Sequence, residues 1–103
     1  MSAELPYAIS KGAIHQMTLS LADTLGDRGI TVNTVNPGPT DTGWASSNMA
    51  ARVQASLPRG RWNNPDEIAA VVRWLVSADA ATITGQVIDA ESGFRRWSPS
   101  HMG

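Results

Sequence analysis

One β-branched run that stops at two prolines limits the possible folds of this chain more than any other stretch. Ile30–Val35 reads Ile-Thr-Val-Asn-Thr-Val, a composition that favours a β-strand, and Gly29 stands immediately before it. Asn36–Pro39 follows with the sequence Asn-Pro-Gly-Pro, and two prolines around a glycine cannot continue a hydrogen-bonded ladder. We therefore expect a strand whose C-terminal end passes directly into a rigid loop.

A long helix is expected before this strand. Over Leu5–Asp27, apolar residues recur at spacings of three and four, which is the helical period. Gly29 stands where a left-handed C-cap would end such a helix. Apolar side chains cover more than half of the helix circumference, so the helix should pack against neighbours on two sides, a sheet and a second subunit. These apolar residues are Ile9, Ala13, Ile14, Met17, Leu21, Ala22 and Leu25.

A second helix and a second strand are expected after the loop. Asn64 can cap the helix, Pro65 suits its first position, and the acids Asp66-Glu67 favour the positive end of the helix dipole. The helix should end near Ser77, and Gly85–Asp89 should form the strand. The expected buried face of this helix consists of Ile68, Val72, Leu75 and Val76.

The element order predicts an incomplete α/β fold. A strand, a helix and a second strand form a right-handed parallel unit in nearly all known cases. Parallel sheets are normally buried on both faces and contain more than two strands. We therefore expect the second half of a doubly wound Rossmann-type sheet, with helix, strand, lid, helix and strand in that order and the N-terminal dinucleotide-binding half absent. The weakly patterned lid would span about residues 40–63, with a short helix over Met49, Val53 and Leu57.

Tyr7 and Lys11 form the first candidate site. They stand four residues apart on the first expected helix and so share one of its faces. A nearby ammonium favours the phenolate form, which lowers a phenol pKa from its ordinary value of about 10. Such a phenol can donate and accept a proton near neutral pH. A solvated pair on a helix surface is the alternative interpretation, because this spacing also arises by chance.

Composition and charge argue against several other classes of protein. The net charge is −1 without a basic stripe, so nucleic-acid binding has little support. The chain contains no cysteine, which excludes a disulfide framework and thiolate metal sites, and no metal site is expected. No apolar run approaches the roughly 20 residues of a membrane span, and no signal-peptide pattern is present. The expectation is a soluble cytoplasmic protein that does not bind membranes.

Several motifs together resemble the short-chain dehydrogenase/reductase family. Tyr7-x-x-x-Lys11, Asn36-Pro37-Gly38 and Gly85-Gln86 occur in the family's order and at its spacing, and the resemblance covers about residues 4–94. Bacterial members of the 3-oxoacyl-acyl-carrier-protein-reductase type are the most similar. The resemblance implies an NAD(P)-dependent oxidoreductase that interconverts a carbonyl and an alcohol by hydride transfer. Further matching stretches are Gly29–Asn33, Gly60-Arg61, Pro65–Ala69 and Ile83–Gln86.

The resemblance also implies a role for individual residues. Tyr7 would be the general acid or base at the substrate oxygen, and Lys11 would make the phenol more acidic and hold the nicotinamide ribose. Both would therefore contact the cofactor, NAD or NADP, as well as take part in catalysis. Residues 42–57 would form the lid over a small carbonyl or alcohol substrate.

The loop after the first strand receives the remaining roles. By the same resemblance, Pro37 and Gly38 would flank the nicotinamide, and the backbone at Pro39 would meet its carboxamide. The hydroxyl of Thr42 would contact the cofactor.

The chain departs from the family pattern in ways that leave a second hypothesis open. The family's catalytic serine and glycine-rich dinucleotide turn would lie before residue 1, so the chain alone is expected to be inactive. Near the C-terminus the usual Asp-Gly-Gly reads Glu91-Ser92-Gly93, so this turn should differ. The alternative to an oxidoreductase is a non-catalytic oligomerisation or interaction fragment. A homo-oligomer is expected through the first helix and the last strand.

Overall fold

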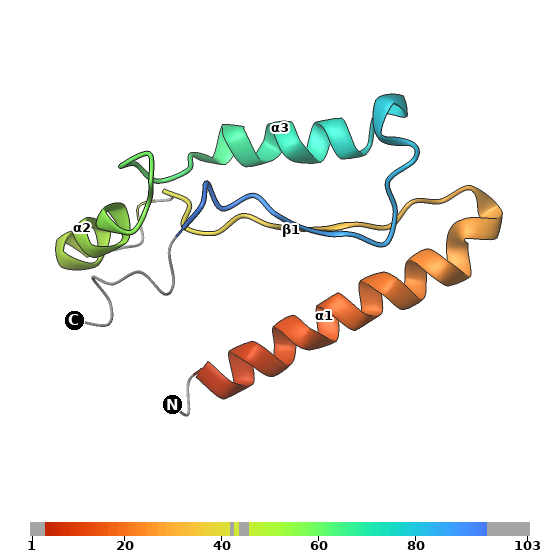
Figure 1. Cartoon of the computed structure of the whole chain (residues 1–103), viewed down its shortest axis with the longest axis horizontal. Helices are drawn as coiled ribbons and strands as arrows, with labels where there is room; N and C mark the ends of the chain where they lie inside the picture. The colour runs from red at the N-terminus through yellow and green to blue at the C-terminus, as the bar shows by residue number, and fades with distance from the viewer. Residues whose placement is uncertain (1–3, 42, 44–45, 95–103) are drawn as a thin grey trace. The chain divides into compact units, whose positions relative to one another are not determined.

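The computed structural model describes residues 4–41, 43 and 46–94 and shows an α/β arrangement (Figure 1). Among these residues, two three-residue strands pair in parallel and form a two-stranded sheet, which confirms the predicted α/β class and the order of helix, strand, helix and strand. Two short 3₁₀ turns follow the first and the third helix. The elements are α1 (Glu4–Leu25), β1 (Thr34–Asn36), α2 (Ser47–Ala55), α3 (Pro65–Leu75) and β2 (Val87–Asp89), and the 3₁₀ turns are Gly26–Arg28 and Ala78–Ala80.

The chain divides into two compact units, one built from residues 1–35 and 74–88 and the other from residues 36–73 and 89–103. In the first unit, small residues join α1 to the segments around the strands. Thr18 is 2% exposed, and its Oγ1 donates to the carbonyl of Ile14 at 2.7 Å and lies 2.6 Å from the hydroxyl oxygen of Thr34. Ala22 is also buried, and a Cβ added at Gly85 would lie 3.4 Å from its methyl group. Small side chains therefore allow the helix to approach the backbone closely.

Both strands are shorter than predicted. The first was expected over Ile30–Val35 and is found over Thr34–Asn36, and the second was expected over Gly85–Asp89 and begins only at Val87. Asn33 explains part of the difference, because its side-chain amide donates to the carbonyl of Ile83 at 3.1 Å and accepts from the amide of Gln86 at 3.2 Å. These side-chain contacts accompany the backbone hydrogen bond from Gly85 to Val32 at 2.7 Å just before the strands begin.

The ends of the helices follow their local signals closely. After α1 ends at Leu25, the 3₁₀ turn closes on Gly29, which has a φ of +72° and donates its N–H to Gly26 at 3.0 Å. This confirms the predicted left-handed cap. α3 begins at Pro65 as predicted but ends at Leu75, two residues before the expected end.

The predicted burial of the helix faces is only partly correct. On α3, Leu75 is 7% exposed, whereas Val72 is 44% and Val76 is 80% exposed. The prediction for these two valines was wrong: Val76 lies in the turn beyond the helix, and Val72 lies on a face that the described residues leave open to solvent. On α1, several apolar side chains predicted to pack are likewise open: Ile9 is 63%, Ile14 is 46%, Met17 is 53% and Leu21 is 40% exposed.

Candidate functional site

Two of the predicted site residues lie on α1, in the first unit. Tyr7 and Lys11 occupy positions i and i+4 of the helix, so both project from one face as expected. Tyr7 is 64% exposed, and Lys11 is partly exposed. A phenol and an ammonium on the same helix face can contact one ligand, the first as donor and acceptor and the second as a cation with three donors.

The other predicted site residues belong to the loop after β1, in the second unit. Gly38 has a φ of +63°, a left-handed conformation that favours glycine. A Cβ at this position would lie 2.9 Å from both Cβ and Cγ of Glu91, which is itself 6% exposed. The close approach of this buried side chain therefore explains the glycine without any ligand. Thr42 lies outside the described residues.

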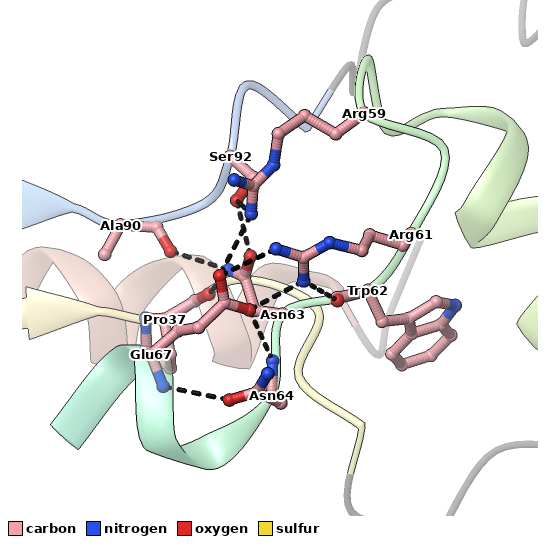
Figure 2. A network of polar contacts seen from close by, with 9 residues as sticks. All are labelled: Pro37, Arg59, Arg61, Trp62, Asn63, Asn64, Glu67, Ala90 and Ser92. Atoms are coloured by element: carbon pink, nitrogen blue, oxygen red, sulfur yellow. Dashed lines mark hydrogen bonds and ion pairs between the residues drawn. The ribbon is translucent and has the colours of Figure 1, made fainter. Parts of the chain in front are cut away.

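Asn63 holds this loop, although the sequence analysis assigned it no role. It is 2% exposed, and its Nδ2 group donates to the carbonyls of Pro37 at 3.0 Å and of Ala90 at 2.9 Å (Figure 2). Its backbone N–H donates to the carbonyl of Pro39 at 3.2 Å, and its carbonyl accepts from the amide of Asp41 at 2.8 Å. One residue thus joins the loop after β1 to the chain that follows β2.

The turn after β2 contains Ser92. Ser92 has a φ of +53° and is the only non-glycine residue with a positive φ in the described part of the chain. Its hydroxyl donates to Oδ1 of Asn63 and accepts from the guanidinium of Arg59 at 3.3 Å. The side chain of Ser92 is thus part of the network drawn in Figure 2.

Glu67 forms the charged part of the same network. Arg61 donates to its two carboxylate oxygens at 2.7 and 2.9 Å, and Arg59 donates to Oε2 at 3.1 Å. Glu67 and Asn64 also cap α3 reciprocally: the amide of Glu67 donates to Oδ1 of Asn64 at 3.0 Å, and the amide of Asn64 donates to Glu67 at 3.1 Å. The hydrogen bonds from Arg61, then from the Asn64 backbone, hold the pKa of the Glu67 carboxyl well below its usual range.

The short helix predicted over Met49, Val53 and Leu57 corresponds to α2, which ends at Ala55. Ser46 caps it by accepting a hydrogen bond from the amide of Met49 at 3.2 Å. One face of α2 lines an open cavity of about 480 Å³ within the second unit. The lining residues are Ser46, Asn48, Met49, Arg52, Val53, Ser56 and Phe94. A largely apolar hollow with a few polar groups is typical of small-molecule sites.

In residues 4–41, 43 and 46–94, no three His, Asp or Glu side chains gather in a group that could hold a metal ion. None of the helices described is both long enough and apolar enough to cross a membrane.

The chain is similar to several proteins that are named as oxidoreductases or reductases. Residues 1–95 match the family model described as Enoyl-(Acyl carrier protein) reductase. The chain is 45% identical over 96 residues to the uncharacterized oxidoreductase YjdA of Bacillus subtilis (strain 168), covering 93% of the chain and 38% of YjdA.

Solved structures with similar sequences share this fold. The angucycline C-6 ketoreductase LanV, solved with bound NADP, has a TM-score of 0.82 and 41% identity over 87% of this chain and 36% of LanV. A 3-oxoacyl-[acyl-carrier protein] reductase from Brucella melitensis ATCC 23457 has a TM-score of 0.81 and 34% identity over 85% of this chain and 34% of that protein. The chain therefore spans less than two fifths of the length of these relatives.

Proposed function

This chain belongs to the short-chain dehydrogenase/reductase family, and from that membership we propose that it is the catalytic and substrate-binding part of an NAD(P)-dependent oxidoreductase. The reaction interconverts a carbonyl and an alcohol. In this proposal, residues 1–103 form part of one Rossmann-type domain. The observation that carries the proposal is the family match over residues 1–95, which includes the Tyr7–Lys11 pair and the Asn-Pro-Gly loop after a parallel strand.

The donor set of the chain fits the nicotinamide riboside part of the cofactor. The ammonium of Lys11 offers three donors to ribose hydroxyls, and the exposed phenol of Tyr7 lies on the same helix face. The loop of Pro37–Pro39 leaves the C-terminal end of a parallel strand, where open α/β sheets bind ligands. The carbonyl of Pro39 already accepts one hydrogen bond, and its second lone pair can accept another from a carboxamide.

The chemistry assigned to the chain is proton transfer. Tyr7 donates its hydroxyl proton to the substrate carbonyl oxygen during reduction, and its phenolate accepts the alcohol proton in the reverse direction. The nicotinamide, when bound, supplies or accepts the hydride. By the family resemblance, Thr42 adds a hydroxyl contact to the cofactor.

The test is made in the native polypeptide that carries this chain. NADH- and NADPH-dependent reduction of a panel of aldehydes and ketones should be detectable, and Tyr7→Phe should reduce kcat by at least about 100-fold because the proton donor is lost. Binding of the cofactor should persist in this variant. Gln16→Ala, a change at an exposed position about two and a half turns further along α1, is the matched control. Undiminished turnover in Tyr7→Phe would remove Tyr7 from the mechanism.

A non-catalytic oligomerisation fragment is the second candidate function. It is favoured by the exposed apolar side chains of α1, among them Leu5 at 56% and Ile9 at 63%. Burial of such side chains against a second copy releases about 25 cal/mol for each Å² removed from water. In this proposal, α1 and β2 pair with their counterparts in a homo-oligomer, an arrangement that is also compatible with the first candidate.

A further inference from the structure

We propose that Asn63 is a positioning residue that holds the Pro37–Asp41 loop in the shape in which it meets the nicotinamide. The inference rests on the proposed function and assigns a residue outside the predicted site to the same cofactor. It is carried by the hydrogen bonds of one buried side chain (Figure 2).

Every hydrogen-bonding group of the Asn63 side chain is used. Its two Nδ2 protons point to the carbonyls of Pro37 and Ala90, and Oδ1 accepts from the hydroxyl of Ser92. An aspartate has the same shape but lacks both donors, and a glutamine is longer by one methylene group. Because the residue is 2% exposed, water cannot readily replace a lost partner. The position therefore requires an amide of this length.

The loop depends on such donors because of its own sequence. Pro37 and Pro39 have no N–H, so this segment cannot be fixed by donating hydrogen bonds from these residues. Its first three carbonyls accept instead: the Asn63 side chain donates to that of Pro37, the hydroxyl of Thr40 donates to that of Gly38 at 3.2 Å, and the backbone N–H of Asn63 donates to that of Pro39. The N–H of Asp41 donates to the carbonyl of Asn63 at 2.8 Å. Loss of the side-chain amide group of Asn63 would leave the carbonyl of Pro37 without its donor. The loop would then loosen at Pro37, a residue proposed to flank the nicotinamide.

Ser92 fixes the orientation of the amide. A hydroxyl donor at Oδ1 directs the NH₂ group toward the two carbonyls and disfavours the flipped amide. Ser92 has a left-handed conformation that a glycine would adopt without strain. The left-handed turn alone would favour glycine at this position. The presence of serine is therefore consistent with a role for its hydroxyl group, which donates to Oδ1 of Asn63.

The experiment compares ligands that differ only in the nicotinamide. In the native polypeptide, dissociation constants are measured for NADH against ADP-ribose and for NADPH against 2′-phospho-ADP-ribose. Asn63→Asp should weaken binding of the preferred dinucleotide by about tenfold and change the affinity of its nicotinamide-free counterpart by less than about twofold. Amide hydrogen exchange of the unliganded protein should accelerate at Gly38, Thr40 and Asp41. Asn64→Asp, the same change one residue later, is the matched control because aspartate also caps a helix.

The outcomes separate this inference from the proposed function. If the wild type binds neither dinucleotide, the proposed function fails, and this inference fails with it. If the wild type binds one and Asn63→Asp binds it equally well, or loses both the dinucleotide and its counterpart to the same extent, Asn63 has no positioning role and the proposed function stands. Should Asn63→Asp fail to fold, Ser92→Gly removes only the orienting hydroxyl while relieving the left-handed strain. It should still lower the preference for the nicotinamide about threefold, and an unchanged preference would overturn the inference.

Discussion

Gly38 offers a quantitative test of how tightly the loop after β1 is packed. In Gly38→Ala, the left-handed φ of +63° costs a residue with a Cβ about 1–2 kcal/mol. The new methyl group would also lie 2.9 Å from Cβ and Cγ of Glu91, and overpacking of this kind costs about 1–3 kcal/mol more. We therefore expect the free energy of unfolding to fall by about 2–5 kcal/mol in total.

Gly60→Ala is the matched control for this substitution. Gly60 has a φ of +70° and belongs to the same unit, but a Cβ there meets no atom within 4 Å. In both variants, alanine makes the unfolded chain less flexible and so stabilises the folded state by the same small amount. The difference in unfolding free energy between the two variants therefore reports the contact with Glu91 alone. Urea unfolding of the native polypeptide followed by tryptophan fluorescence measures both. An equal loss of stability in the two variants would refute the tight packing of Gly38 on Glu91.

Two further predictions concern the charged network and the exposed helix. The pKa of Glu67 is lowered in the folded state, so its ionised carboxylate contributes fully to stability above the ordinary pKa of about 4.3. This contribution is lost progressively as the pH falls from that value toward the lower pKa of the folded state. The difference in thermal midpoint between wild type and Glu67→Gln should therefore shrink from pH 6 to pH 3. Asp66→Asn is the control, and a difference independent of pH would contradict the ion pairs with Arg61 and Arg59. The 103-residue chain should sediment as an oligomer that Met17→Lys weakens, and a monomer in sedimentation velocity would argue against self-association through α1.

Features fixed by neighbouring residues could be predicted from the sequence. The end of the first helical segment was predictable because it depends on the left-handed backbone of Gly29 and on its hydrogen bond to Gly26, three residues earlier. The start of α3 was predictable because proline suits the first position of a helix, and Pro65 occupies that position. Strand ends were less predictable. Whether Asn33 extends the ladder or bonds Ile83 with its side chain depends on a segment 50 residues away, which composition does not reveal.

The limit of prediction for the candidate site is clearest in two adjacent residues of the same type. Asn64 could be assigned as a cap because Pro65 follows it, and the spacing of Asn64 and Glu67 also fits the reciprocal cap that the structure contains. Asn63 has no comparable local signal, since its side-chain partners lie 26 to 29 residues away along the chain. Motifs could therefore identify the residues proposed to meet the cofactor, but the residue that supports their loop could be found only from tertiary contacts. Asn63→Asp and Asn64→Ala consequently test different levels of organisation: the first should alter the loop, and the second, which removes the capping side chain, should alter the start of α3.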